Sequence, residues 1–461
     1  MKKIKLAYIG GGSKMWANIF MSDLSLQKDL CGEICLYDID YDAALRNQKL
    51  GNIINNCDNV VTKWGYTVTR DIDSALINAD VVVISILPGT FKEMASDVHT
   101  PEKYGIYQSV GDTTGPGGIL RAMRTVPIFE FFGKKIKELC PDAIVVNLTN
   151  PLAICVKTLY SVYPRIKAFG CCHEVFNTQE FLCKVIQKEM GVLPSRKDLS
   201  CNITGVNHFT WMTRCYYGHY NVFNILNKFI KKHYNEGLYE HGNPDDYKTN
   251  PFAYGNLVKM DLFKKYGILP CAGDRHLVEF MDPKMYLASP GVVDNWHFAL
   301  TSVDYRIQKA NEKIEYLNDV VSGKIKFELK KSNEEAVDLI KALLGLGDVK
   351  SNINMPNCCQ AAYLPPSSVV ESNCLFTKGL FKPDKTTTDI PDEVAEMINL
   401  NAKNQIKLHL AILSRDMYAI FNVFKTDPLC KYLKEADSKV LFKEMVENTK
   451  AYLEPFYDLR G

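Results

Sequence analysis

Hydrophobic residues in the first half of the chain gather in short continuous runs that are separated by longer amphipathic stretches. Runs of this kind are typical of parallel strands that helices cover on both faces. Strands that alternate with helices predict a doubly wound α/β sheet. The runs expected to be strands are Lys5–Ile9, Glu33–Tyr37, Val81–Leu87, Ala143–Asn147, Ile166–Gly170 and Cys201–Val206, the last of which should close the sheet.

The second half of the chain has a different pattern, in which helical periodicity predominates. Helices are expected at about 216–239, at about 257–263 and over a long amphipathic region from 392 to 424. Ser332-Asn333-Glu334-Glu335 has the form of a capping box and predicts a helix that reaches about Leu344. This half is therefore expected to be mixed α+β, with helices in the majority.

The glycine turn after the first run is the first candidate binding element. Gly10-Gly11-Gly12-Ser13 follows the strand directly, and a helical pattern begins near Lys14. Glycines let the backbone approach a pyrophosphate, and a helix N-terminus offers it free amides. Met15 stands where the third glycine of the dinucleotide fingerprint would be, so the turn alone is also compatible with an ordinary loop.

The end of the second strand supplies an acid that strengthens this interpretation. Asp38 follows the strand at the distance that suits the ribose hydroxyls of NAD, and its charge would repel the extra phosphate of NADP. Turn and acid together favour NAD. We therefore expect two domains, a Rossmann-like NAD-binding domain at 1–205 and a larger α+β domain for catalysis and oligomerisation at 206–461.

Polar residues also follow the later strands, where open α/β sheets bind ligands. Pro88-Gly89 ends the third run and Asn147-Leu148-Thr149-Asn150 ends the fourth, so Pro88 and Asn147 are expected to contact the cofactor. The loop 111–118 precedes a helix and falls on the same edge. It is either simple punctuation or, as we favour, a loop that binds substrate or cofactor.

The fifth and sixth runs end at candidate metal ligands, Cys172 and His208. A thiolate and an imidazole from neighbouring strand ends can converge on one ion, and two protein ligands leave the open positions that a catalytic metal needs. By softness this pair suits zinc, iron or cobalt better than manganese. A third cluster, Asp274-Arg275-His276, is compatible with either a site or a salt-bridged loop.

Composition excludes several classes of protein. Lys and Arg number 55 against 53 Asp and Glu, and this near-neutral balance argues against a nucleic-acid or membrane-surface partner. We expect no membrane span, because no apolar stretch of about 18 residues occurs. The 15 scattered cysteines include no C-x-x-C pair, and the N-terminal run is too short for a signal peptide, so a reduced, cytoplasmic protein is expected.

Taken together, these residues resemble glycoside hydrolase family 4, the NAD-dependent glycosidases, over essentially the whole chain. The resemblance implies a Rossmann domain with a larger catalytic domain, bound NAD, a divalent metal that is usually Mn²⁺, and a homodimer or homotetramer. The residues that carry it are Gly10–Ser13, Gly115–Gly118 with Arg121 and Arg124, Asn147–Pro151, Cys172-His173, Asn207-His208, Leu364-Pro365, Val369–Glu371 and Asp427-Pro428.

Within that family, Cys172-His173-Glu174-Val175 resembles the α-galacturonidase subgroup, which acts on short α-linked galacturonate oligomers from pectin. The resemblance implies oxidation of the sugar at C3 by NAD, elimination across C1–C2, addition of water and re-reduction, with the metal held by Cys172 and His208. Such enzymes depart from the two-carboxylate scheme of most glycosidases.

The resemblance also assigns roles to single residues. His173 stands where phospho-sugar members carry their acid. Many members have a tyrosine as base in a motif that here reads Arg275–Phe280, so the base is expected to be Asp274 or His276. The residues expected to contact substrate are Asn150, Glu174, Asn207 and Arg275, the last through the uronate carboxylate.

Three alternatives stay open on the sequence. An α-glucuronidase differs from an α-galacturonidase only in the stereochemistry of its substrate at C4. A 2-hydroxyacid dehydrogenase would use a similar nucleotide half and a loop histidine, but it needs no metal, so chelation would leave it active. A protein that senses NAD without catalysis would release no product from any glycoside.

Overall fold

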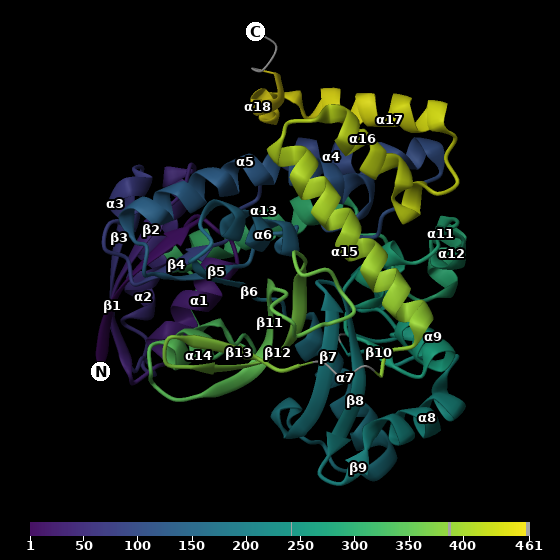
Figure 1. Cartoon of the computed structure of the whole chain (residues 1–461). Helices are drawn as coiled ribbons and strands as arrows, with labels where there is room; N and C mark the ends of the chain where they lie inside the picture. The colour runs from purple at the N-terminus through teal and green to yellow at the C-terminus, as the bar shows by residue number, and fades with distance from the viewer. Residues whose placement is uncertain (241, 386–388, 458–461) are drawn as a thin grey trace.

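The computed structural model describes residues 1–240, 242–385 and 389–457, and one mixed sheet runs through them (Figure 1). The strand order is β10-β8-β7-β12-β11-β6-β5-β4-β1-β2-β3, with β13 beside β12 and β9 beside β8. The strands are β1 Lys2–Ile9, β2 Leu30–Tyr37, β3 Trp64–Thr69, β4 Val81–Ile84, β5 Ile144–Asn147, β6 Lys167–Gly170, β7 Leu199–Val206, β8 Phe209–Tyr217, β9 Tyr220–Asn221, β10 Leu269–Pro270, β11 Val349–Pro356, β12 Val369–Thr377 and β13 Leu380–Pro383.

The part of the sheet from β3 to β6 is entirely parallel and has the strand order 3-2-1-4-5-6 of dinucleotide-binding folds. Side chains alternate between its two faces, because successive residues of a strand point in opposite directions. Leu6 and Tyr8 pack into one hydrophobic cluster, whereas Ala7 and Ile9 pack into another. This confirms the expected doubly wound α/β fold.

Helices cover both faces of the parallel part. In Figure 1, α3, α5 and α6 lie on one side of the strands and α1, α2 and α14 on the other. The helices are α1 Trp16–Ser25, α2 Tyr41–Ile54, α3 Ile72–Leu76, α4 Phe91–His99, α5 Gly115–Leu139, α6 Leu152–Val162, α7 Glu174–Met190, α8 Val222–His233, α9 Leu257–Tyr266, α10 Asp274–Leu277, α11 Pro283–Tyr286, α12 Pro290–Asn295, α13 Val303–Val321, α14 Ala336–Leu343, α15 Asp392–Leu413, α16 Met417–Thr426, α17 Glu435–Asn448 and α18 Glu454–Tyr457.

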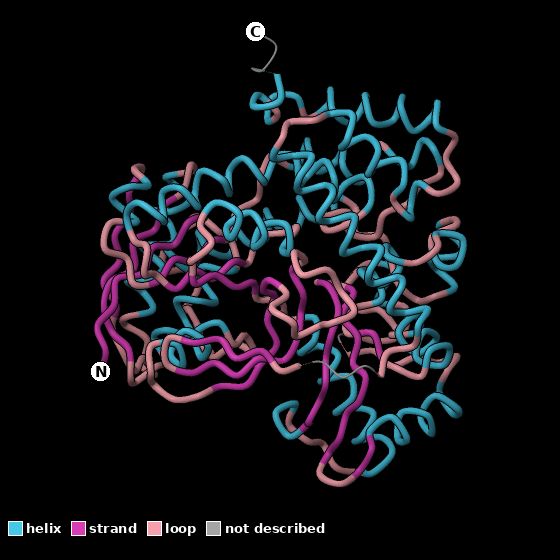
Figure 2. The backbone as a smooth tube through the Cα atoms, viewed as in Figure 1, coloured by secondary structure: helices cyan, strands magenta, loops and turns pink. Residues whose placement is uncertain are grey.

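The continuation of the sheet beyond β6 is antiparallel and differs from the sequence prediction. β11 and β12, from the last third of the chain, lie between β6 and β7, with Asn354 opposite Gly170 and Glu371 opposite Gly205. The strand predicted at 201–206 therefore does not close the sheet beside the parallel strands. In Figure 2 the strands continue from the Rossmann part into the second half without a break. The predicted domain boundary at 205 falls near the end of β7 and stays a prediction.

Several predicted helices begin or end elsewhere. The region from 216 starts as strand and becomes helical at α8, whose first turn is capped by Asn221. The predicted capping box is wrong: the Ser332 hydroxyl donates to Asp23, and α14 begins only at Ala336. The long helix predicted over 392–424 is two helices, because Arg415 between them has a left-handed φ of 57°.

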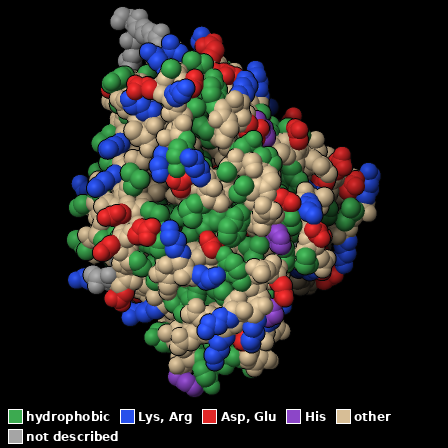
Figure 3. All heavy atoms as spheres, turned by 90° about the vertical axis from the view of Figure 1, so that its right-hand side faces the viewer, with side chains coloured by type: hydrophobic (Ala, Val, Ile, Leu, Met, Phe, Trp, Pro, Cys, Tyr) green, Lys and Arg blue, Asp and Glu red, His purple; other side chains and the backbone are tan. Residues whose placement is uncertain are grey.

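The second half also forms a helical layer on the right of the view in Figure 1. Figure 3 looks at that side and shows hydrophobic side chains gathered between charged ones in the middle of the face. Among the large hydrophobic residues that are exposed are Leu400 and Leu410 of α15, Tyr418 of α16 and Val440 of α17. Within the described ranges, no helix has the length and apolar character needed to cross a membrane.

Candidate active site

The glycine turn between β1 and α1 is held in a form that leaves no room for side chains. Gly10 has a φ of 91°, and a Cβ there would lie 2.0 Å from the Ser85 carbonyl oxygen. The Asp38 carboxylate accepts the Gly12 N–H at 2.8 Å. The Asn47 amide donates to the carbonyl oxygens of Gly11 and Ser13 at 2.7 and 2.8 Å. The backbone at this turn is thus open to a close approach from outside.

Asp38, which accepts the Gly12 N–H, also lines a hollow of about 430 Å³. Arg70 also lines it, with the guanidinium 4.4 Å from the centre of the Tyr41 ring. Burial raises the pKa of Asp38, and N–H groups of Asp40 and Gly12 oppose that rise. A carboxylate that accepts two N–H groups still has lone pairs for ribose hydroxyls, so the turn and the hollow fit the adenosine end of NAD.

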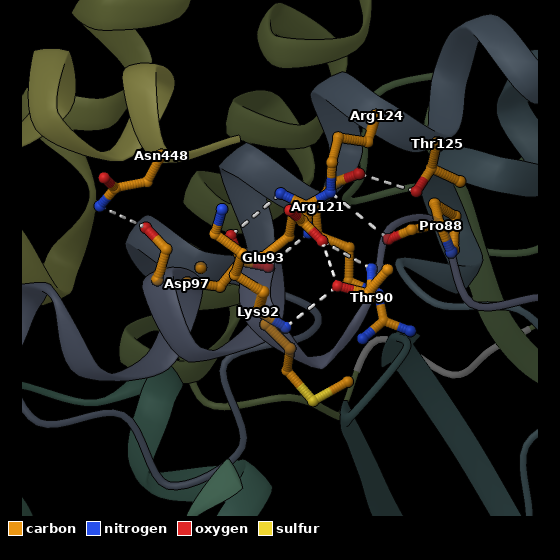
Figure 4. Close-up of polar contacts among 12 residues, drawn as sticks. Pro88, Thr90, Lys92, Glu93, Asp97, Arg121, Arg124, Thr125 and Asn448 are labelled. Atoms are coloured by element: carbon orange, nitrogen blue, oxygen red, sulfur yellow. Dashed lines mark hydrogen bonds and ion pairs between the residues drawn. The ribbon is translucent and has the colours of Figure 1, made fainter. Parts of the chain in front are cut away.

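The loops after β4 and β5 are braced by side-chain hydrogen bonds to their backbone. The Pro88 carbonyl accepts a 3.4 Å hydrogen bond from Arg124, which also forms a buried ion pair with Asp97 of α4 (Figure 4). The Asn147 amide donates to and accepts from the backbone of Thr149, both at 3.0 Å. Pro88 and Asn147 therefore lie at the expected edge of the sheet, but these contacts shape the loops that border it.

Three metal-type donors meet at the edge between the two halves of the sheet. One donor atom each of Asp112, His208 and His276 lies within 4.8 Å of the others. The rings of His208 and His276 are 3.9 Å apart between centroids. His208 occupies the turn between β7 and β8 with a left-handed φ of 64°, and its Nδ1 lies 2.8 Å from the Thr113 hydroxyl. Such a backbone is uncommon outside glycine and is typical of functional sites.

Burial and neighbouring charges both shift pKa values in this cluster. Burial alone would raise the pKa of Asp112, but Arg121 and the two histidines lower it below its ordinary value. Burial, and then the neighbouring His208, lower the pKa of His276 to about 3. The His276 Nδ1 is buried and has no hydrogen-bond partner among the residues that the structure describes. The cluster therefore holds a neutral ring with a free nitrogen beside an ionised carboxylate.

Cys172 is not one of the three mutually close donors found among the described residues. Burial, and then the charges of Glu371 and Glu174, raise the pKa of the Cys172 thiol well above its ordinary value. The Asn207 side chain lies close enough to the thiol to lower that pKa in part. Cys172 is thus brought next to the residue that precedes His208.

Glu174 links the two candidate proton-transfer histidines. Its carboxylate accepts the Gly273 N–H at 2.5 Å, and its Oε1 lies 3.7 Å from His173 Nε2 and 3.9 Å from His276 Nε2. His173 is partly exposed and packs against Trp16 of α1, with 5.7 Å between ring centroids. His173 therefore stands between the nucleotide turn and the histidine cluster.

The remaining predicted residues divide into two groups. Asn150 donates to the Asp112 carboxylate at 3.1 Å, and Arg275 is buried with its Nη1 donating to Thr301 at 2.7 Å. Asp274 points away from the histidines, because its carboxylate accepts the N–H groups of Val258 and Lys259 at the start of α9. It therefore caps a helix, and of the two candidate bases only His276 faces the cluster.

The sequence prediction did not assign three residues that shape this site. Asp112 was within a suspected loop, but nothing in its spacing marks it as a ligand. Glu279 accepts the N–H groups of Val110 and Gly111 at 2.7 and 2.8 Å and so holds that loop. Glu371 on β12 accepts hydrogen bonds from Thr210 and Asn352 behind Cys172. Their positions depend on pairing between distant segments, which local patterns do not reveal.

The donor set fits a divalent transition metal. Carboxylate and imidazole are ligands that Mn²⁺, Fe²⁺ and Zn²⁺ all accept, and a nearby thiol adds a soft ligand. The free Nδ1 of His276 is a buried polar atom for which such an ion or a substrate would provide a partner.

The chain matches the models of both domains of one enzyme family. Residues 5–188 match the family 4 glycosyl hydrolases and residues 203–430 match the C-terminal domain of that family. It is 46% identical to an alpha-galacturonidase of Thermoanaerobacter italicus over 98% of this chain and 97% of that protein.

Solved structures agree with these matches. The structure of lplD from Bacillus subtilis has a TM-score of 0.91 and 40% identity, and the alignment covers 96% of this chain and 100% of that one. A 6-phospho-alpha-glucosidase from gut microorganisms, solved with NAD and Mn²⁺, has the same fold with a TM-score of 0.81 at 17% identity over 98% and 99% of the two chains. A metal-free hydroxyacid dehydrogenase is thereby set aside, and the chain belongs to family 4 of the glycosyl hydrolases.

Proposed function

We propose that this glycosidase hydrolyses α-galacturonides, the short galacturonate oligomers derived from pectin, with NAD and a divalent metal as cofactors. The high identity to a named alpha-galacturonidase along the whole chain supports this substrate class. The geometry that carries it is the environment of Arg275, which offers a cation for the carboxylate that distinguishes a uronide from a neutral sugar.

Arg275 is a buried cation that forms no ion pair with any acidic residue in the described part of the chain. It is 5% exposed, and its Nε has no hydrogen-bond partner among the described residues. Its guanidinium lies 4.2 Å from the centre of the Phe252 ring, and Thr301 holds one of its terminal nitrogens. Buried charges are normally paired. By contrast, the equally buried Arg124 is neutralised by Asp97. A substrate carboxylate is the partner that Arg275 lacks.

Two histidines carry out the two proton transfers in this proposal. His276, with its free ring nitrogen, takes the proton from C2 of the sugar. His173, which Glu174 orients, gives a proton to the departing C1 oxygen. Asn150 donates a hydrogen bond to the Asp112 carboxylate and contacts the neighbouring sugar hydroxyls. Asn207, whose side chain lies at the Cys172 thiol, also contacts the substrate.

The proposed cofactors fit the residues at two places. The turn Gly10–Ser13 and Asp38 would hold NAD, which when bound exchanges hydride with C3 of the sugar. Cys172 and His208, with Asp112 beside them, would hold the metal, which as a Lewis acid stabilises negative charge on the sugar oxygens.

A panel of aryl α-glycosides with NAD, Mn²⁺ and a reductant tests the proposed substrate. The galacturonide should be cleaved fastest, and the galactoside, which lacks the carboxylate, at least tenfold more slowly. Faster cleavage of the glucuronide would instead indicate the alternative C4 specificity.

The matched variants Arg275→Lys and Arg275→Gln test the role of the cation. Galacturonide turnover should fall about tenfold in Arg275→Lys and about a hundredfold in Arg275→Gln, because lysine keeps the charge without the paired donors. Equal losses on the galactoside would contradict the role of Arg275.

The assembly and compartment are also part of the proposal. We propose a homodimer or homotetramer, supported by the exposed hydrophobic residues Leu400, Leu410 and Tyr418 of the helical layer. We propose the cytoplasm as its location, supported by the free state of all 15 cysteines. Light scattering after size exclusion would give the assembly, and a monomeric mass at micromolar concentration would contradict it.

A further inference from the structure

Two cysteines of the β7–β8 hairpin, neither of them part of the Asp112/His208/His276 cluster, face each other. Cys201 and Cys215 are directly opposite in the antiparallel register, and their sulfur atoms are 3.4 Å apart. Residues opposite each other on antiparallel strands have Cα atoms about 4.5–5.5 Å apart, and disulfides span Cα distances of about 4.4–6.8 Å. A bond between these sulfurs therefore requires little more than side-chain rotation.

The two thiols have unequal surroundings. Cys201 is partly exposed and lines a hollow of about 500 Å³ between α7 and the edge of β11, whereas Cys215 is fully buried. Gln179 of α7 donates to the Cys201 sulfur at 3.7 Å. The sulfur–sulfur contact with Cys215 lowers the pKa of Cys201, burial opposes that change and Gln179 adds to it. The same contact and burial raise the pKa of Cys215. Cys201 is thus the thiol of the pair that a reagent in the hollow reaches first.

Two further cysteines, Cys183 and Cys271, lie near enough to influence this pair electrostatically. Among the described residues, however, no three metal-type donors that include Cys201 lie within 4.8 Å of one another. The arrangement therefore favours chemistry between two sulfurs over a thiolate metal site.

We propose that Cys201 and Cys215 form a reversible dithiol–disulfide site that reacts with low-molecular-weight disulfides entering this hollow. The Cys201 thiolate attacks one sulfur of the small disulfide, forming a mixed disulfide and releasing one small thiolate. Cys215 then loses its proton and attacks the Cys201 sulfur, which releases the second small thiolate. Two protein thiols lose two electrons and two protons in total, and the small disulfide is reduced to two thiols. The new bond ties together the two strands whose turn carries His208.

The test uses the full-length chain with Cys358→Ser and Cys359→Ser, which removes an exposed adjacent cysteine pair that would also react. The protein is treated with glutathione disulfide, alkylated and mapped by peptide mass. We expect the peptides of Cys201 and Cys215 to be joined with the loss of two hydrogens, and dithiothreitol to separate them. In Cys215→Ala the reaction should stop at a glutathione adduct on Cys201.

The same map can overturn the proposal without any further variant. A lasting glutathione adduct on Cys201 while Cys215 remains free would show that the second sulfur does not resolve it. Two unreacted thiols, or a bond from either to Cys183 or Cys271, would equally contradict the pairing. The Cys201–Cys215 bond is measured in the protein that retains both of these cysteines. Poor folding of Cys215→Ala would therefore not affect this conclusion.

Discussion

At the scale of single residues, the candidate site depends on His208, the residue around which the other donors are arranged. Its left-handed backbone lets the two-residue turn between β7 and β8 place the ring against His276. The sequence pointed to His208 because it follows a strand. It could not reveal Asp112 as a neighbour, since 96 positions separate the two and only the sheet topology joins them.

The first prediction concerns the metal. Cys172→Ser should abolish metal-dependent cleavage while NAD still binds, because the thiol serves only the metal in the proposed arrangement. Asp112→Asn should weaken Mn²⁺ binding about 10–100-fold, the usual loss when a group that supports the metal ligands is changed. Calorimetric titration of Mn²⁺ and fluorescence titration of NAD measure the two effects separately. Turnover of Cys172→Ser at the wild-type rate would remove that residue from the metal site.

A second prediction asks whether Glu279 acts by holding the loop that carries Asp112 or by its negative charge. Burial raises its pKa to about 8, and one of its oxygens accepts both loop N–H groups. Glu279→Gln keeps that acceptor and should leave kcat within about threefold, whereas Glu279→Ala frees the loop that carries Asp112 and should lower kcat by about a hundredfold. NAD affinity serves as the control and should not change. Equal losses in both variants would show that the ionised acid is needed.

At the scale of elements, five of the six parallel strands were predictable because continuous apolar runs have few other interpretations. β3 was not predicted, since its buried and exposed residues alternate at its start and it forms no apolar run. β11 and β12 were not predicted, because they are rich in buried polar residues. Ser351, Asn352 and Asn354 of β11 are buried; Asn352 donates to Glu371 of β12 and Ser351 donates to Glu335, so hydrogen bonds take the place of apolar contacts. Such strands show neither an apolar run nor clean alternation.

The seam between α4 and α5 provides the third prediction. Asp97 and Arg124 are each 2% exposed and paired, and Figure 4 shows them beside the Pro88 loop. Asp97→Asn should lower the free energy of unfolding by about 3 kcal/mol, because it leaves a buried guanidinium without its counter-charge. The double variant Asp97→Leu/Arg124→Met should recover most of that loss. Urea unfolding gives both values, and a loss below about 1 kcal/mol in the single variant would contradict this account.

His409 of α15 provides a prediction about pH. It is 1% exposed, neither ring nitrogen has a hydrogen-bond partner among the described residues, and burial, then Lys157, lower its pKa to about 4. The unfolded chain takes up this proton near pH 6.5 and the folded one only near 4, so stability falls as pH drops through that window. Between pH 7.5 and 5 the loss should be about 2 kcal/mol.

The matched variant His409→Leu should reduce that pH dependence by about the same amount. Urea midpoints of both proteins at the two pH values provide the comparison. An unchanged pH dependence in His409→Leu would show that other groups cause the loss.

At the scale of the whole molecule, one sheet joins the nucleotide turn to the histidine cluster. The Rossmann half ends at β6, which delivers Cys172, and the antiparallel half delivers His208 and, through α10, His276. Sequence patterns predicted the nucleotide turn and His208 separately, without the distance between them. The inserted β11–β12 pair that sets the distance between them could be known only from the three-dimensional fold.

The central claim is that the sugar is oxidised for a moment so that its C2 proton can be removed. Cleavage of an aryl α-galacturonide in D₂O, followed by NMR of the released galacturonate, tests it most directly. We expect deuterium at C2 of the product, because the proton taken there exchanges with solvent before it is replaced. A product that carries hydrogen and no deuterium at C2, together with an unchanged rate for substrate deuterated at C2, would contradict this mechanism and indicate direct displacement.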